Sequence, residues 1–198
     1  MIKVIIFDGV NCITYQEPLS IGLERDYGIP LEKSLPFFKG PLQDCVAGQA
    51  DVKEVILPYL DLWGWEKGVD EILKYWFERD HKMDTGLISY INELRKKGIL
   101  CLLATNNEKY RFAYMLDKMN FNKIFDKNYC SALMKCKKPN QEFFARIYED
   151  LQNIKKDQIL FWDDKAENVE GAKKFGIQAE LYTSFENFKE KMKQYLAE

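Results

Sequence analysis

The amino terminus of the chain limits its fold more than any other stretch. Residues 2–7 form an almost unbroken apolar run that is rich in β-branched side chains. Such a run is typical of a strand buried on both faces, as the strands of parallel sheets are. Asp8 follows the run directly, and a carboxylate at the carboxyl end of a central parallel strand lies where open α/β sheets bind their ligands. Taken alone, Asp8 is explained equally well as a residue that caps a turn or a helix.

The second half of the chain alternates between helical and strand patterns. An amphipathic helix is expected over residues 85–97, and further strands follow it, each separated from the next by a helical pattern. These strands are 99–104, 129–134, 158–162 and 178–182. Strands that alternate with helices of this length indicate right-handed βαβ crossovers and a parallel sheet. The expected fold class is therefore α/β, with a Rossmann-like core of three layers.

Residues 15–84 differ from the rest of the chain because they carry helical patterns without a convincing strand. Breakers such as Gly28 and Pro30 divide this segment into several helices. Its aromatic residues are interpreted as packing rather than as a cofactor site. We therefore expect two units: an α/β core formed by residues 1–14 and 85–198, and a small helical cap formed by residues 15–84 and inserted after the first strand.

Charge and cysteine usage narrow the class of protein. The formal net charge is −2 and the basic residues form no dense block, so neither nucleic acid nor a membrane surface is an expected partner. No apolar run reaches the ~20 residues that a membrane span requires, and the amino terminus lacks the pattern of a signal peptide. The cysteines are irregularly spaced and form no Cys-x-x-Cys pair. We expect a reduced, cytoplasmic protein, and its oligomeric state is not predicted.

Polar side chains follow four of the expected strands. They are Asp8 after the first strand, Thr105 with Asn106 after the second, Lys138 in the loop after the third, and Asp163 with Asp164 after the fourth. Because the carboxyl ends of parallel strands share one edge, these side chains are expected to converge on one crevice. Singly, each has a simpler explanation, since a threonine after a strand is commonly a turn residue and an acid pair commonly caps a helix. Together and in this order, they favour a functional site.

Each of these groups has a task in phosphoryl transfer. The Asp8 carboxylate is a candidate nucleophile that would form an aspartyl phosphate. Together with Asp8, the acid pair after the fourth strand offers the hard oxygen ligands that Mg²⁺ prefers, and this cation offsets the repulsion between a carboxylate and a phosphate dianion. Thr105 and Asn106 are candidates to bind the phosphate oxygens through a hydroxyl and backbone amides. The Lys138 ammonium adds positive charge there.

Four segments of the chain carry a resemblance to a known superfamily. In order they are Ile-Ile-Phe-Asp8, Leu-Leu-Ala-Thr105-Asn106, Lys137-Lys138-Pro139 and Leu-Phe-Trp-Asp163-Asp164-Lys-Ala-Glu-Asn168-Val-Glu-Gly171-Ala. This series resembles the haloacid dehalogenase superfamily, above all the branch that contains small sugar-phosphate phosphatases, phosphoglucomutase-like enzymes and the dehalogenases. The fourth segment is the most specific, and the resemblance covers essentially the whole chain.

The resemblance implies a role for each matching residue. Asp8 matches the nucleophile, and Thr105 and Lys138 match the residues that bind phosphate. Asp163 and Asp164 match the acids that hold Mg²⁺. The helical insert matches the mobile cap of this branch, which closes over the substrate and whose inner face sets specificity.

One position departs from the pattern of the superfamily. Its phosphatases carry a second aspartate two residues after the nucleophile as general acid and base, and Val10 occupies that position here. If two residues are instead deleted, Gly9 and Val10 match the Gly-Val that follows the second aspartate, and the acid is still absent. Valine cannot protonate a leaving alkoxide, a contribution typically worth ~10²–10⁴ in rate. The backbone carbonyl of Val10 remains a candidate ligand of Mg²⁺.

These observations lead to one leading hypothesis and two alternatives. We expect a Mg²⁺-dependent phosphatase that acts on a small phosphorylated metabolite through an aspartyl phosphate at Asp8, with turnover slowed by Val10. The first alternative is a catalytically impaired relative that binds a phosphorylated ligand or partner without turnover; retention of Asp8, Thr105, Lys138 and Asp164 favours the enzyme. A dehalogenase ranks third, because those enzymes need no metal and an acid pair without a cation would repel the nucleophile.

Overall fold

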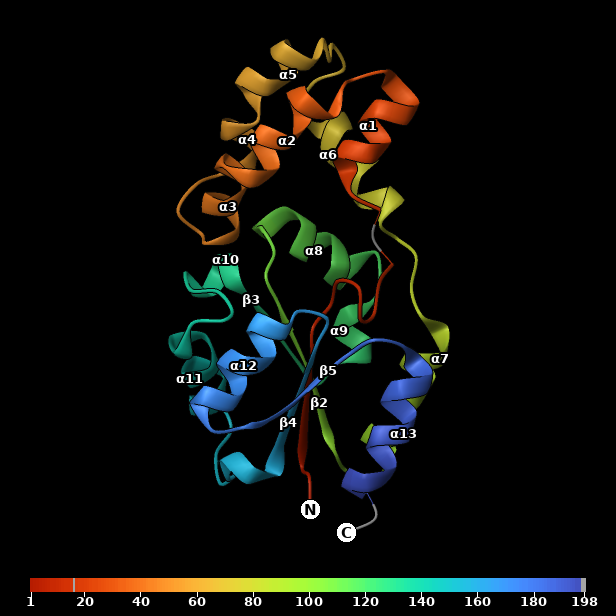
Figure 1. Cartoon of the computed structure of the whole chain (residues 1–198), viewed down its shortest axis with the longest axis vertical. Coiled ribbons are helices and arrows are strands. Elements are labelled where there is room, and N and C mark those ends of the chain that lie inside the picture. Colours follow the sequence, from red (N-terminus) through yellow and green to blue (C-terminus); the bar gives the residue numbers. More distant parts are fainter. Residues whose placement is uncertain (16, 197–198) are drawn as a thin grey trace.

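The computed structural model describes residues 1–15 and 17–196. Within these residues the core contains a sheet of five parallel strands in the order β3-β2-β1-β4-β5 (Figure 1). The strands are β1 (Val4–Phe7), β2 (Leu100–Thr105), β3 (Lys127–Cys130), β4 (Ile159–Asp163) and β5 (Gln178–Leu181). The prediction of an α/β fold with a parallel, Rossmann-like sheet is thereby confirmed.

Strand β1 lies in the centre of the sheet because both of its faces are apolar. Ile5 and Phe7 belong to the hydrophobic cluster on one face, and Val4 and Ile6 belong to the cluster on the other. A strand buried on both sides requires this pattern, since successive side chains point to opposite faces. The register of β1 with β2 and β4 brings the carboxyl ends of the three strands to one edge.

Helices cover both faces of the sheet (Figure 1). One face is covered by α7 (Thr85–Lys96), α8 (Lys109–Asp117), α9 (Phe121–Ile124) and α13 (Phe185–Leu196). The other face is covered by α11 (Gln141–Glu149) and α12 (Ala166–Phe175), with the short α10 (Ser131–Met134) after β3 and a 3₁₀ turn, η1 (Lys156–Gln158), before β4. Among the described residues, no helix combines the length and the apolar character that crossing a membrane demands.

A separate group of helices, which we call the helical unit, lies beyond the carboxyl ends of the strands (Figure 1). It contains α1 (Leu19–Tyr27), α2 (Leu31–Lys39), α3 (Pro41–Val46), α4 (Val52–Val55), α5 (Leu57–Trp63) and α6 (Val69–Arg79). These helices pack around a hydrophobic cluster of their own, in which Leu23, Phe37, Ile56 and Ile72 are fully buried. Many of the aromatic residues pack against one another there, as Phe37 does against Trp63.

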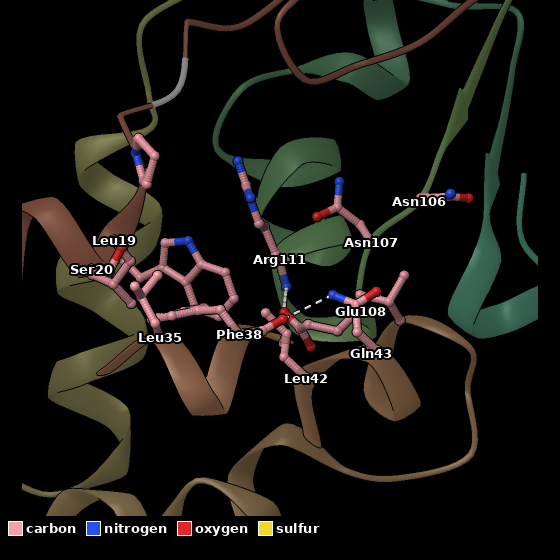
Figure 2. A pocket seen from close by; sticks show the side chains of 13 residues that line it. Leu19, Ser20, Leu35, Phe38, Leu42, Gln43, Asn106, Asn107, Glu108 and Arg111 are labelled. Carbon is pink, nitrogen blue, oxygen red and sulfur yellow. Dashed lines mark hydrogen bonds between the residues drawn. The ribbon is translucent and has the colours of Figure 1, made fainter. Parts of the chain in front are cut away.

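Two segments join the helical unit to the sheet, and they run side by side. Thr14 forms an antiparallel bridge with Met83, and the amide of Asp84 donates a hydrogen bond of 2.9 Å to the carbonyl of Ile13. Beyond these connections, α2 and α3 face the first turn of α8 across a cavity (Figure 2).

The third strand differs from its prediction. The sequence pattern predicts a strand over 129–134, but β3 spans Lys127–Cys130 and α10 follows it over Ser131–Met134. β3 is an edge strand whose first three residues are exposed or only partly buried, so it lacks the apolar run that marks a central strand. The apolar residues after it are alanine, leucine and methionine, which are strong helix formers.

Candidate active site

The carboxyl ends of three strands meet around one buried ammonium group. The side chain of Lys138 is almost fully buried, and its Nζ donates a hydrogen bond of 2.6 Å to Oδ1 of Asp8, which follows β1. The same Nζ donates bonds of 2.7 Å to Oδ2 of Asp163 in β4 and to the carbonyl oxygen of Ala104 in β2. A lysine ammonium has three donors, and each of them has an acceptor here. Lys138 therefore links the three strand ends.

Asn106 and α12 hold the loop that carries Lys138. The side chain of Asn106 pairs with the backbone of Lys138: its Nδ2 donates to the Lys138 carbonyl, and its Oδ1 accepts from the Lys138 amide, both at 3.0 Å. On the other side of the loop, a Cβ at Gly171 of α12 would lie 2.6 Å from the carbonyl oxygen of Pro139. This close approach requires glycine. The side chain of Asn106, a predicted phosphate-binding residue, therefore positions Lys138.

The two acids at the end of β4 have different surroundings. Asp163 is fully buried, and its Oδ1 accepts hydrogen bonds of 2.9 Å from the amide of Lys165 and from Nδ2 of Asn168. Its Oδ2 accepts from Lys138, so both oxygens have partners within the protein. Asp164 is partly exposed, and its Oδ2 accepts from Nδ2 of Asn11 at 3.1 Å. Asp163 therefore organises Lys138 and α12, whereas Asp164 faces the open side.

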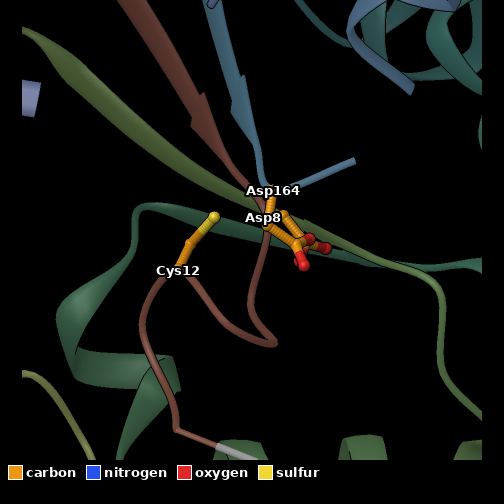
Figure 3. Close-up of side chains that lie close together, drawn as sticks. All are labelled: Asp8, Cys12 and Asp164. Carbon is orange, nitrogen blue, oxygen red and sulfur yellow. The ribbon is translucent and has the colours of Figure 1, made fainter. Parts of the chain in front are cut away.

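A group of side chains that fits a cation lies next to Lys138. The carboxylate oxygens of Asp8 and Asp164 and the sulfur of Cys12 lie within 4.8 Å of one another (Figure 3). Burial raises the pKa of the Cys12 thiol well above its ordinary value, and the charges of Asp8 and Asp163 add to this shift, so the sulfur carries a proton at neutral pH. Since a neutral thiol is a poor ligand and carboxylates suit hard cations, the donor set fits Mg²⁺ through its two carboxylates.

A cavity of about 140 Å³ opens over these groups. It is lined by Asp8, Val10, Asn11, Asn106, Asn107, Arg111, Lys138, Asp164, Lys165 and Asn168. Of the predicted site residues, Thr105 and Asp163 are not among its lining residues. The Thr105 side chain is fully buried, and its Oγ1 accepts a hydrogen bond of 2.8 Å from Nδ2 of Asn107.

The structure also brings Asn107 and Arg111 to this cavity, and sequence reasoning missed both. Arg111 lies in the first turn of α8 and is only 6% exposed. Its Nη2 lies 2.9 Å from Oδ2 of Asp80, at the end of α6 in the helical unit. The signal that points to Arg111 is its place one turn after the Thr105-Asn106-Asn107 loop, in a helix that begins at the sheet edge.

Burial and charge act in opposite directions on the two central groups. Burial raises the pKa of Asp8 to about 7, and the charges of Asp163 and Asp164 add to this, although the Lys138 ammonium opposes it. Burial lowers the pKa of Lys138, but the charges of Asp8 and Asp163 outweigh it, so that this pKa lies above its ordinary value. Lys138 is therefore charged at neutral pH, and a cation in the cavity would favour the ionised form of Asp8.

A second cavity, of about 290 Å³, lies between the helical unit and the core (Figure 2). It shares Asn106, Asn107 and Arg111 with the first cavity, so the two are adjacent. The remaining lining residues are Glu108 of the core and Pro18, Leu19, Ser20, Leu35, Phe38, Leu42, Gln43, Val46 and Trp76 of the helical unit and the segment before it.

The chain is similar in sequence to known phosphatases. It is 25% identical over 166 residues to a phosphorylated carbohydrates phosphatase of Thermotoga maritima, in a match that covers 83% of this chain and 70% of the relative. It is 30% identical over 95 residues to a sesquiterpene phosphatase of Aspergillus oryzae, in a match that covers only 48% of this chain and 47% of the relative.

The fold is also that of a solved enzyme structure. A haloacid dehalogenase family enzyme of Bacteroides thetaiotaomicron, solved in complex with magnesium and inorganic phosphate, superposes with a TM-score of 0.78. The two share 20% sequence identity, and the superposition covers 93% of this chain and 96% of that one. The family model of haloacid dehalogenase-like hydrolases matches residues 26–181, more than half of the sequence. The superfamily and the class of enzyme predicted from the sequence are thus confirmed: the chain belongs to the haloacid dehalogenase-like hydrolases.

Proposed function

We propose that the protein is a Mg²⁺-dependent phosphatase that cleaves a small phosphate monoester through an aspartyl phosphate at Asp8. One observation carries this proposal: the Asp8 carboxylate faces a cavity while a buried lysine holds one of its oxygens. Lys138 bonds to Oδ1, and among the described residues no hydrogen bond reaches Oδ2. Oδ2 is therefore the nucleophilic oxygen.

The reaction has two steps in this account. In the first, Oδ2 of Asp8 attacks phosphorus, and the bond between phosphorus and the ester oxygen breaks with its electron pair on that oxygen. In the second, a water molecule attacks the phosphorus of the aspartyl phosphate, which releases phosphate and restores the Asp8 carboxylate. The ammonium of Lys138 and the guanidinium of Arg111 place positive charge where negative charge develops.

The donor set at the sheet edge suits Mg²⁺. Asp8, Asp164 and the backbone carbonyl of Val10 would hold this ion, and Asp163 would act by fixing Lys138. The bound ion would supply charge that offsets the repulsion between the carboxylates and the phosphate dianion. The similar Bacteroides enzyme, with magnesium and phosphate in its structure, supports this assignment.

The phosphate group lies against Lys138 and the loop after β2. Asn106 and Asn107 line the cavity, but the amide of Asn107 already donates to Oγ of Ser131 at 3.1 Å, so Asn106 is the residue that offers its backbone amide. The Thr105 hydroxyl fixes the Asn107 side chain. All three residues, Thr105, Asn106 and Lys138, are predicted to bind phosphate. In this proposal Lys138 acts on the phosphate through its charge, and the side chains of the other two position neighbouring groups.

The missing acid limits the range of good substrates. Val10 lines the cavity beside Asp8 and has no proton to give, so the leaving alkoxide takes its proton from water. General acid catalysis is typically worth ~10²–10⁴ in rate, and we expect that loss mainly for esters of weakly acidic alcohols. The same feature favours the alternative, a protein that binds a phosphorylated ligand without turnover.

The segment of residues 15–84, which contains the helical unit, acts as a cap over this site. The Oγ of Ser131 donates a hydrogen bond of 2.6 Å to the carbonyl of Val46, and Tyr110 donates one of 2.9 Å to Oδ2 of Asp51. Lys109 forms an ion pair of 2.6 Å with the same carboxylate. These contacts support a closed position in which the substrate is shielded from bulk water.

Hydrolysis of p-nitrophenyl phosphate tests the proposal, because its good leaving group depends least on the missing acid. We expect activity with Mg²⁺, and its loss both with EDTA and in the Asp8→Asn variant. The Asp61→Asn variant serves as a matched control, since Asp61 is exposed on α5 of the helical unit and should leave activity unchanged. Absence of hydrolysis for every ester, together with Mg²⁺-dependent binding of phosphate, would instead establish the binding protein.

A further inference from the structure

The residues that line the cavity between the helical unit and the core determine which leaving groups it can bind. It adjoins the proposed phosphate site through Asn106, Asn107 and Arg111, so the alcohol part of a bound monoester would lie in it. At about 290 Å³ it has room for a single ring or a short branched chain.

The wall formed by the helical unit is almost entirely apolar. Leu35, Phe38 and Leu42 lie along it, opposite the first turn of α8 (Figure 2). Among the described residues of this unit, only Ser20 and Gln43 bring polar side chains to the cavity. The Nε2 of Gln43 already donates to the carbonyl of Phe38 at 2.9 Å, so this amide is held on its own helices.

The polar groups on the core side also have partners. The carboxylate of Glu108 accepts hydrogen bonds from the backbone amides of Tyr110 and Arg111 and thereby caps α8. The guanidinium of Arg111 pairs with Asp80 of the helical unit. Asn106 is paired with the Lys138 backbone through both of its polar atoms. Glu108 and Asn106 therefore have little capacity left for the hydroxyl groups of a ligand, and the N–H donors that Arg111 retains serve the phosphate in the proposed reaction.

A polyhydroxylated leaving group is therefore a poor match for this cavity. Each hydroxyl that leaves water without a new partner weakens binding by about tenfold or more. An apolar leaving group loses nothing of this kind and gains from its contact with the leucine and phenylalanine side chains.

We infer that the substrate of the proposed phosphatase is a phosphate monoester of an apolar alcohol or phenol, carrying one ring or a short branched chain, rather than a sugar phosphate. The inference rests on the proposed function. It adds the class of leaving group, which the names of the two phosphatase relatives leave open because one concerns carbohydrates and the other a sesquiterpene.

The test compares esters of primary alcohols, so that the acidity of the leaving group is similar and its polarity differs. The substrates are benzyl phosphate, 3-methylbutyl phosphate, glucose 6-phosphate and glycerol phosphate, with p-nitrophenyl phosphate as the reference for activity. We expect kcat/KM to be at least about tenfold higher for the two apolar esters than for glucose 6-phosphate. Equal or higher values for the sugar phosphate would overturn the inference and leave the phosphatase intact.

Two variants connect the preference to the cavity. Leu35→Gln adds a polar group to its wall and should reduce the ratio between benzyl phosphate and glucose 6-phosphate several-fold. Leu62→Gln alters an exposed leucine of the same unit that does not line the cavity, and should leave the ratio unchanged. An equal effect of both variants would contradict the placement of the leaving group.

A binding measurement separates this inference from the proposed function. If no ester is hydrolysed, p-nitrophenyl phosphate included, the phosphatase proposal fails, but the affinities of Asp8→Asn for the same esters can still be compared by calorimetry. We expect benzyl phosphate to bind at least about tenfold more tightly than glucose 6-phosphate. Equal affinities, or tighter binding of the sugar phosphate, would refute the inference in that case too.

Discussion

Replacement of Lys138 by methionine probes the arrangement at the sheet edge directly. The ammonium of Lys138 is buried and bonded to two carboxylates and one carbonyl, so its removal leaves Asp8 and Asp163 without their common partner. Breaking a buried ion pair by removing one partner typically destabilises a protein by about 3–5 kcal/mol. We expect a loss of about this size at pH 8 for Lys138→Met in the absence of metal.

The size of this loss should depend on pH, with a sign set by Asp8. Burial raises the pKa of Asp8 to about 7 in the folded protein, against 3.8 for the free side chain. A carboxyl group with a raised folded pKa binds protons more readily when folded, so its contribution to stability falls as the pH rises from about 4 through about 7. Without Lys138, which lowers this pKa, the fall should be steeper and extend to higher pH. The destabilisation should therefore be smaller at pH 5 than at pH 8.

Urea unfolding in EDTA at pH 5 and pH 8 measures both effects. Lys137→Met is the matched control, because Lys137 is the preceding residue and, among the described residues, its exposed Nζ donates a hydrogen bond only to Oε1 of Gln43, at 3.4 Å. The control should change the free energy of unfolding little, as surface substitutions do, by about 0.5 kcal/mol or less. A loss below about 1 kcal/mol for Lys138→Met, or an equal loss at both pH values, would refute this reasoning.

Three further predictions concern activity toward phosphate esters. Val10→Asp restores a general acid beside Asp8, and alkyl phosphate hydrolysis should rise by ~10–10² or more; no rise in a folded variant with Mg²⁺ would count against the site. Gly171→Ala pushes on Pro139 and displaces Lys138, so kcat should fall while circular dichroism stays unchanged. Since the pKa of Asp8 is raised to about 7, kcat/KM should decrease as the pH falls below 7. Saturating Mg²⁺ should move this decrease to lower pH, and a pH profile that Mg²⁺ leaves unchanged would contradict the role of Asp8.

Much of the fold and of the site follows from short-range patterns in the sequence. The apolar run before Asp8 predicts a central strand because burial on both faces excludes polar residues. The convergence of Asp8, Lys138 and Asp163 follows from topology, because parallel strands end at one edge. The pattern predicts a strand over 129–134 instead of Lys127–Cys130, because an edge strand needs no apolar run to form.

The individual roles of the polar residues could not be predicted from the sequence. Nothing in the pattern shows that Asn106 pairs with the Lys138 backbone, or that Thr105 accepts a bond from Asn107, since these contacts depend on loops that meet only in the fold. Arg111 is another such case, because its partner Asp80 lies in the helical unit, 31 residues earlier in the chain.

In the proposed reaction Asp8 becomes phosphorylated, and this aspartyl phosphate can be trapped. The protein would be mixed with Mg²⁺ and p-nitrophenyl phosphate, quenched in acid during turnover, digested, and mapped by mass spectrometry. We expect a phosphoryl group on the peptide that contains Asp8, and none in Asp8→Asn, which should also release no p-nitrophenol. Continued release of p-nitrophenol by Asp8→Asn, with no phosphorylated Asp8 peptide from the wild-type protein, would contradict the proposed reaction.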